Sequence, residues 1–397
     1  MPAQRAIIKP ELLVWTREEA GLSIEDAAKK ISKTPEQLRA AEQGESQLTV
    51  RQLRILSNAY KRPLAFFYLP QPPAKTVGLR DFRRPPQEIS EPDSPRLLHE
   101  VRRARYRRTI ALQLLEELGE SISPFTTTAT LQDQTADVAV RLRDLLGVSR
   151  TEQKHFPDEY AAFNAWREAI ERANVAVFQT TSVSNREMLG FSLSEPLLPV
   201  IVLNVKDAPV RRIFTMLHEM VHLMLRTGGI CTLREVQAIE VFCNEVAGEA
   251  LVPQAWLLAE TVVRDHGRQT EWPDGLIQAL ARRYRVSRET ILRRLLVAGY
   301  TTQRFYEAKR EQYKLEYEAR VEAAARQIKE SDKEIRISPS TVAVYESGRM
   351  FIQLVLESYR RDKITLSQVS DYLEVRTKHL DRIARAVNNP ALEIGAA

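Results

Sequence analysis

Apolar residues recur at three- and four-residue intervals along the first 60 residues, which predicts four short helices joined by tight turns. Gly21 is expected to end the first helix, ELLVWTREEA, and Ser23 to cap the second. Thr34 with Gln37 resembles a capping box for TPEQLRAAEQG, and VRQLRILSNAY supplies the fourth helix. Two short helices around a tight turn predict a helix-turn-helix, whose second helix can enter the DNA major groove.

A proline-rich segment follows this bundle. Seven prolines lie between Pro70 and Pro95, which disfavours both helix and sheet and predicts an extended linker. The next stretch, RLLHEVRRARYRRTIALQLLEELG, has helical spacing and an arginine-dense first half. A solvated helix face is the preferred interpretation of these arginines, ahead of nucleic-acid contact.

The pattern becomes mixed from about Ala136. VAVRLRDLLGV and EYAAFNAWREAIERA have helical spacing, whereas NVAVFQT, EMLGFSL and LPVIVLN are short runs of β-branched or aromatic residues. Three strands beside helices predict a small α+β domain and not a doubly wound sheet.

The remainder of the chain reads as helical. A long, charged helix is expected from about Thr301 and could serve as an oligomer contact, and a compact helical unit from about Ser338 to Val387. LARRYRVSRETILRRLLVAG and ITLSQVSDYLEVRTKHLDRIARAV both have helix-turn-helix rhythm. Plain helical packing is the preferred interpretation of both stretches.

Composition adds limits to this outline. A chain of 397 residues with 44% hydrophobic and 28% charged residues is expected to be globular, with two to four domains. No apolar run is long enough to span a bilayer, and the N-terminus lacks a secretion signal. Two cysteines suit a reducing cytoplasm, which is the expected location. A net charge of +6 permits nucleic-acid contact without arguing for it.

The stretch FTMLHEMVHLML carries candidate chemistry within an apolar helix. His218 and His222 are four residues apart, so they share a helix face and can both reach one zinc ion. Glu219 lies about 100° further round the helix and can act as a general base. This is the HExxH motif of zinc peptidases, and it makes satisfied core histidines the less favoured interpretation.

A third protein ligand is required by most catalytic zinc sites. The next helix, LREVQAIEVFCNEVAGEALVP, offers four glutamates at positions 235, 240, 245 and 249, and spacing alone does not choose among them. Cys243 lies on the same helix, but the two cysteines lack metal-ligand spacing, and a packing role is preferred for Cys243.

The segments PVIVLN, RRIFTMLHEMVHLML and IEVFCNEVAGEALVP resemble the ImmA/IrrE group of zinc-dependent peptidases, which are often fused to an N-terminal helix-turn-helix of the phage-repressor (XRE) type. LLVWTREEAGLSIEDAAKKISKTPEQL and RPLAFFYLPQPP resemble that fused half. The resemblance implies zinc ligands at His218, His222 and Glu240, a catalytic Glu219, and Asn244 one turn after the acidic ligand.

The resulting fold prediction is mainly α, with a small α+β, zincin-like core, an N-terminal helix-turn-helix bundle and a C-terminal helical region. The expected domains are a helix-turn-helix at 1–68, a linker at 69–97, a metallopeptidase at 98–300 and a helical domain at 301–397.

The N-terminal unit has two competing interpretations. Gln37 and Arg39 are suitable contacts to DNA, whereas Glu36 is unfavourable near phosphates. The alternative is a module that docks a repressor of related fold.

The function expected from the resemblance is a zinc-dependent endopeptidase that cleaves a DNA-binding repressor and so relieves transcriptional repression. Its expected partners are that protein substrate, DNA through the N-terminal unit, and further copies of the chain. A helix-turn-helix transcription regulator with a structural or inactive metal site is the alternative, and a toxin–antitoxin component is a third possibility.

Overall fold

The computed structural model describes residues 5–60, 62, 64–72, 82–83, 94–226, 233–330 and 338–388. The chain divides into two compact units, one formed by residues 1–80 and 86–105 and the other by residues 81–85 and 106–397. Among the described residues, no helix is both long enough and apolar enough to cross a bilayer.

Unit 1 is a small helical bundle. Its helices are α1 (Pro10–Glu19), α2 (Ile24–Lys30), α3 (Pro35–Glu42), α4 (Val50–Ala59), the 3₁₀ helix η1 (Leu64–Tyr68) and the first part of α5 (Pro95–Leu118). The predicted caps are confirmed: Ser23 accepts a hydrogen bond from the backbone of Asp26, and Thr34 and Gln37 form a complete capping box. Gly21 follows α1 with a φ of +61°, as a helix-ending glycine should.

The core of unit 1 is made by the apolar stripes of these helices. Leu13, Leu38 and Leu53 are buried in it together with Tyr60 and Phe67. At the edge of the core Arg17 forms a two-pronged ion pair with Glu42, at 2.7 and 3.0 Å, which joins α1 to the end of α3. The four predicted helices therefore close into one bundle around a shared core.

Unit 2 contains a four-stranded sheet in the order β1-β3-β4-β2. β2 (Ala176–Thr180) pairs parallel with β4 (Val200–Asn204), which pairs antiparallel with β3 (Gly190–Leu193). β1 (Phe82–Arg83) pairs antiparallel with β3 and was not predicted, because two residues within a proline-rich segment show no strand periodicity.

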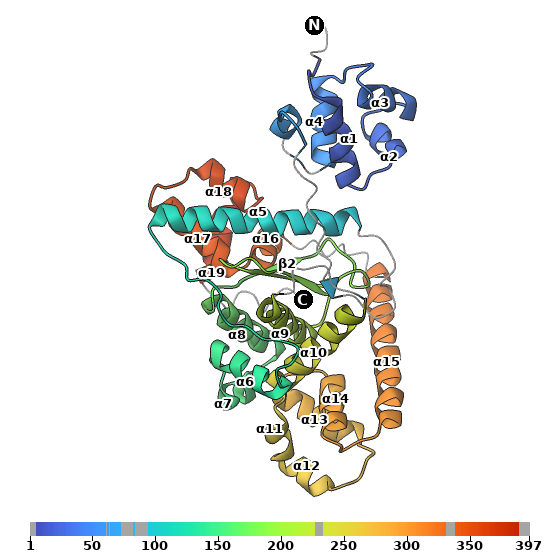
Figure 1. Cartoon of the computed structure of the whole chain (residues 1–397), viewed down its shortest axis with the longest axis vertical. Coiled ribbons are helices and arrows are strands. Elements are labelled where there is room, and N and C mark those ends of the chain that lie inside the picture. Colours follow the sequence, from blue (N-terminus) through green and yellow to red (C-terminus); the bar gives the residue numbers. More distant parts are fainter. Residues whose placement is uncertain are drawn as a thin grey trace. The chain divides into compact units, whose positions relative to one another are not determined.

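Helices cover the sheet on both faces, and every residue of β2, β3 and β4 is buried. In Figure 1 the sheet lies between α8 (Glu159–Arg172) and α9 (Pro209–Leu225) on one side and α16 (Pro339–Ser347) and α17 (Arg349–Arg360) on the other. Phe178 of β2 meets Phe351 of α17 edge to face, with ring centroids 5.9 Å apart. The C-terminal helices therefore form a layer of this unit.

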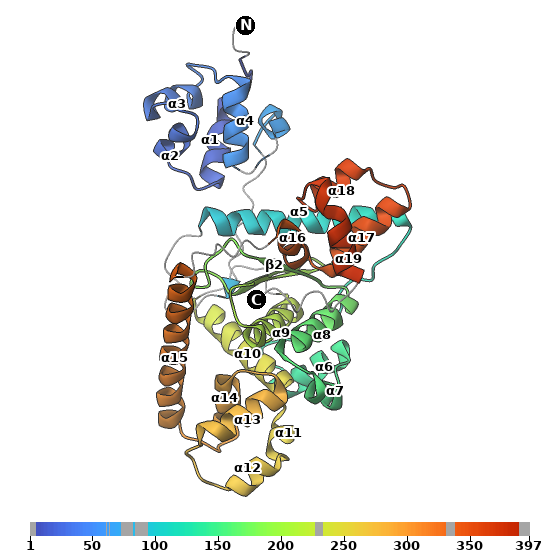
Figure 2. The same ribbon diagram turned by 180° about the vertical axis from the view of Figure 1, so that it is seen from behind.

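The helices on the α9 side of the sheet extend away from it (Figure 2). They are α6 (Thr135–Leu146), α7 (Arg150–His155), α10 (Leu233–Leu251), α11 (Gln254–Leu258), α12 (Thr261–His266), α13 (Asp274–Tyr284), α14 (Arg288–Val297) and α15 (Gln303–Glu330). The last helices, α18 (Leu366–Tyr372), η2 (Thr377–His379) and α19 (Leu380–Asn388), lie beside α16 and α17 on the other side of the sheet. The predicted class, mainly α with a small α+β core, is confirmed.

One of the arginines that were expected to be solvated has a structural role. Arg107 is buried, and its guanidinium donates to the backbone oxygen of Glu346 at 2.7 Å, pairs with Glu374 at 3.6 Å and lies over the ring of Phe178. Arg107 thus ties α5 to the C-terminal helices and is unavailable to an external ligand.

The junction between α16 and α17 generates a test of this packing. Gly348 has φ +71° and ψ 156°, a conformation nearly restricted to glycine, and an added Cβ would lie 2.5 Å from the backbone oxygen of Val177. Gly348→Ala is therefore expected to lower the free energy of unfolding by about 2 to 4 kcal/mol, measured by urea denaturation. Gly275→Ala is the control, because nothing lies within 4 Å of a Cβ there. Equal effects of the two substitutions would contradict the role given to Gly348.

Candidate metal centre

Helix α9 places two histidines in the interior of unit 2. It follows β4 directly, begins with Pro209 at its first position and ends at Leu225, where Arg226 adopts a left-handed conformation. The amide nitrogen of Asn204, at the end of β4, donates to the backbone oxygens of Val183 and Met188 between β2 and β3. Its amide oxygen accepts from the backbone N–H of Lys206 and so fixes the turn between β4 and α9. Because β4 is held in the sheet, the position of α9 is held as well.

The two histidines converge with a carboxylate from α10. Nε2 of His218 and Nε2 of His222 are 3.0 Å apart, and the Glu240 oxygens lie 3.4 Å from the first and 3.1 Å from the second. Both imidazoles are buried, whereas the side chain of Glu240 is 31% exposed. The cluster can therefore be reached from the side of Glu240.

The separations among these donors fit a metal ion. Three corners of a tetrahedron with ligand bonds of about 2.0 to 2.1 Å lie about 3.3 Å apart. The two Nε2 atoms are 3.0 Å apart, and each lies 3.1 or 3.4 Å from a different oxygen of Glu240, which is close to that value. One donor atom from each of the three residues can be chosen with all of them within 4.8 Å of one another. Among the described residues, this is the one group of three or more His, Cys, Asp or Glu side chains that could hold a metal.

The charge of Glu240 supports the same role. Burial alone would raise the pKa of the Glu240 carboxyl, but its interactions with His218 and His222 outweigh burial and hold the pKa below its usual range. The carboxyl is therefore ionised at neutral pH, as a metal ligand must be.

The other glutamates of α10 whose side chains are described do not approach the histidines. Glu249 forms an ion pair with Arg294 and accepts a hydrogen bond from the backbone of Gln254. Glu245 lines a hollow elsewhere on the helix. The side chain of Glu235 lies outside the described part of the chain.

Glu219 lies beside the cluster and is fixed by a residue that the sequence did not single out. Its Oε2 accepts a hydrogen bond of 2.9 Å from Oγ of Ser192 on β3, and both side chains are buried. The sequence offered one sign of this contact, a serine within the apolar strand GFSL, because a buried hydroxyl needs a hydrogen-bond partner. Which partner it would find depends on how the sheet lies over α9.

Cys243 is a packing residue in this structure. It is fully buried in the main core of unit 2, and burial raises the pKa of its thiol to about 11 in spite of the nearby His222. A protonated thiol is a poor metal ligand. Cys231 lies outside the described residues.

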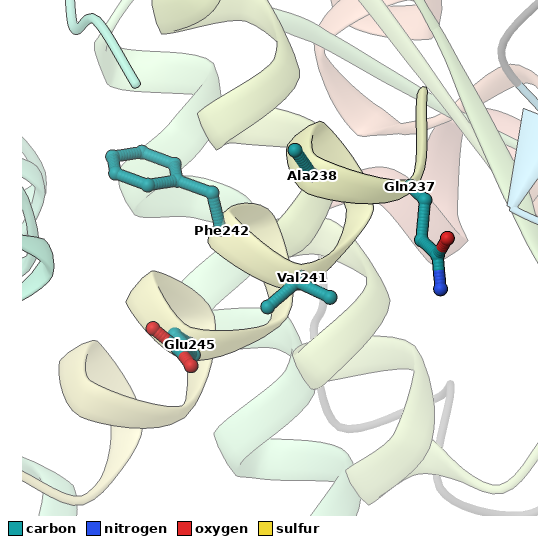
Figure 3. Close-up of a pocket in the computed structure, with 5 residues that line it drawn as sticks. All are labelled: Gln237, Ala238, Val241, Phe242 and Glu245. Atoms are coloured by element: carbon teal, nitrogen blue, oxygen red, sulfur yellow. The ribbon is translucent and has the colours of Figure 1, made fainter. Parts of the chain in front are cut away.

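An open hollow of about 430 Å³ lies along α10, lined by Gln237, Ala238, Val241, Phe242 and Glu245 (Figure 3). It shares no residue with the histidine cluster. Its size alone does not make it the reactive site, because it holds no pair of groups suited to acid–base or metal chemistry.

The other predicted site residues are placed as follows. Asn244 is exposed on α10, one turn after Glu240. Its expected role, to support the zinc ligands without binding zinc itself, stays a prediction. Gln37 and Arg39 are exposed on α3, and the side-chain oxygen of Gln37 accepts from the backbone of Thr34 in the capping box. DNA contact by these two residues also stays a prediction.

Comparison with known families agrees with this geometry. The model of the IrrE N-terminal-like domain, of peptidase family M78, matches residues 170–296, a range that contains His218, Glu219, His222 and Glu240. A helix-turn-helix model matches residues 14–67, a range that contains α2 and α3. Comparison with curated proteins gives no significant match. The chain therefore carries an IrrE N-terminal-like peptidase domain together with an N-terminal helix-turn-helix domain.

Proposed function

We propose that the protein is a zinc-dependent endopeptidase that acts on a specific protein in the cytoplasm. The observation that carries the proposal is the convergence of His218, His222 and Glu240 around a space of metal size, with Glu219 held next to it. The match to a peptidase family across the same residues supports it.

His218, His222 and Glu240 would hold the zinc ion, since two imidazoles and one carboxylate are a common donor set of catalytic zinc sites. When bound, zinc would supply a Lewis acid that activates water and polarises a peptide carbonyl. Three protein donors would leave one position of such a zinc site for the reactants.

Glu219 is the proposed general base. Its carboxylate accepts a proton from the attacking water and delivers this proton to the leaving amine nitrogen. Burial keeps bulk water away from the carboxylate, and the hydrogen bond from Ser192 restricts its rotation. The carbon–nitrogen bond of the substrate can then break without expelling a nitrogen anion, because the nitrogen is protonated as it leaves.

The substrate class follows from the resemblance to the ImmA/IrrE group. A DNA-binding repressor is the proposed substrate, and its cleavage would relieve repression of stress or mobile-element genes. The helix-turn-helix domain of unit 1 supports this, because a separate recognition module would let one enzyme select few proteins.

The metal content of the purified protein tests the ligand set. About one zinc ion per chain is expected in the wild type by elemental analysis, and Glu240→Ala should lower zinc affinity at least about tenfold because the carboxylate is lost. Glu245→Ala removes a carboxylate from the same helix outside the cluster and should leave affinity unchanged. A wild type that binds no zinc after reloading would favour a DNA-binding regulator with an inactive metal site.

Cleavage tests the role of Glu219. Glu219→Gln should retain zinc and lower the rate of cleavage about 10² to 10⁴-fold, because the amide cannot accept the proton. His222→Ala should lose both zinc and cleavage. The measurement is mass-spectrometric mapping of new protein N-termini after a cell lysate is incubated with zinc-loaded protein, with Glu245→Gln as the control of matched charge. Wild-type rates from Glu219→Gln would exclude the proposed mechanism.

A further inference from the structure

Four pairs of helices in the described part of the chain are joined by the same turn: α2–α3, α13–α14, α17–α18 and α18–α19 with its leading turn η2. In each pair one non-glycine residue of the turn has a φ between 52° and 55°, and the backbone N–H of the next residue donates to the carbonyl five positions before it. The residues with positive φ are Ser32, Arg285, Asp362 and Glu374. The hydrogen bonds run from Lys33 to Ala28, from Val286 to Ala281, from Lys363 to Ser358 and from Val375 to Ser370.

This turn is a common way for a helix to end, so it does not by itself distinguish a DNA-binding pair from plain helical packing. The family model for a helix-turn-helix covers residues 14–67 only, so it assigns no role to the other three pairs. In the α17–α18 pair the second helix, α18, carries no basic residue. The accessible surface of the second helix then decides which pair could enter a DNA groove.

In the α13–α14 pair the second helix is covered. Ile291, Leu292 and Leu295 of α14 are buried, and Arg294 is buried in an ion pair with Glu249. Helix α15 lies against the start of α14, where the guanidinium of Arg288 stacks 3.9 Å from the ring centre of Tyr313. Most of this helix is therefore covered and unavailable to a DNA groove.

In the α2–α3 pair the second helix is accessible but nearly neutral. Its exposed residues include Glu36 and Arg39, of opposite charge, and Gln37, whose side chain caps its own helix. The last glutamate of α3, Glu42, neutralises Arg17. This face offers little attraction to phosphates.

In the α18–α19 pair the second helix is accessible and basic. Arg376, Lys378, Arg382 and Arg385 are all exposed, and none of them forms an ion pair with another described residue. Asp381 is the acidic residue on the same face of α19. The balance is therefore four positive charges to one negative charge.

The opposite face of the same helix fixes its orientation. Leu380, Ile383 and Val387 of α19 are buried, as are Val369 and Leu373 of α18. These residues recur at three- and four-residue intervals, so the basic residues must point away from the core. The pair is anchored to unit 2 in addition by the ion pair between Glu374 and Arg107.

We propose that η2 and α19 form a second nucleic-acid-binding site, which enters the major groove of duplex DNA. Arg376, Thr377 and Lys378, at the start of the second helix, are placed to contact base edges, and Arg382 and Arg385 to contact phosphates. The site belongs to the same compact unit as the histidine cluster and does not depend on metal or on peptidase activity.

The test is binding of the full-length protein to a fluorescein-labelled 30-base-pair duplex of random sequence. The affinity is measured by fluorescence anisotropy at salt concentrations from 50 to 200 mM. The double variant Lys378→Gln and Arg382→Gln is expected to bind about tenfold or more weakly, and the slope of log affinity against log salt should fall by about 2. Both residues are exposed, so the thermal unfolding midpoint should not change.

The matched control is the double variant Lys314→Gln and Arg320→Gln, which removes the same charge from exposed positions of α15 and should bind as the wild type does. The variant Arg39→Gln tests whether the helix-turn-helix domain of unit 1 contributes to DNA binding. The proposal is overturned if the wild type does not bind at 50 mM salt, or if both double variants lose affinity equally. It is also overturned if Arg39→Gln abolishes binding while the α19 variant retains it.

Discussion

Two buried imidazoles that face each other at 3.0 Å set the main constraint on this structure. Two nitrogen lone pairs cannot remain this close within an apolar core unless they share a proton, a carboxylate or a metal. Glu240 supplies the carboxylate, and it can do so only if α10 crosses α9 at this point. The apolar surface of both helices, including Met220 and Val246, is buried in the same core, so packing and chemistry require the same arrangement.

The sheet connects this site to the C-terminal helices. Ser192 of β3 donates a hydrogen bond to Glu219. β2, the edge strand that is separated from β3 by β4, contacts α16 and α17. Because both faces of the sheet are covered, the C-terminal helices complete the fold of unit 2. The proposed DNA-binding face and the proposed peptidase site would then belong to one compact body, so DNA contact would bring the peptidase to chromosomal repressors.

The four helix pairs that share one turn geometry show how one local structure can have different outcomes. Their turns agree in φ and in hydrogen bonding, because a few residues suffice to determine the backbone of a turn. What differs is what lies against the second helix and which charges it exposes. α15 covers α14, α3 exposes a nearly neutral face, and α19 exposes a basic one.

The sequence by itself determined the features that depend on neighbours along the chain. The caps at Ser23 and Thr34, the helix-turn-helix domain and the small α+β core were predicted and are confirmed, because capping and periodicity act within one or two turns. The spacing of His218 and His222 on one helix face belongs to the same class of feature.

Only the tertiary structure decided the rest. It brought Glu240, and not Glu245 or Glu249, to the histidines. It also paired β1 with β3, and it turned Ser192 toward Glu219 and Arg107 into the interior. Each of these depends on two segments far apart in the sequence, and residue spacing carries no information about how such segments approach. Packing of the apolar faces selects that approach, and the polar contacts follow from it.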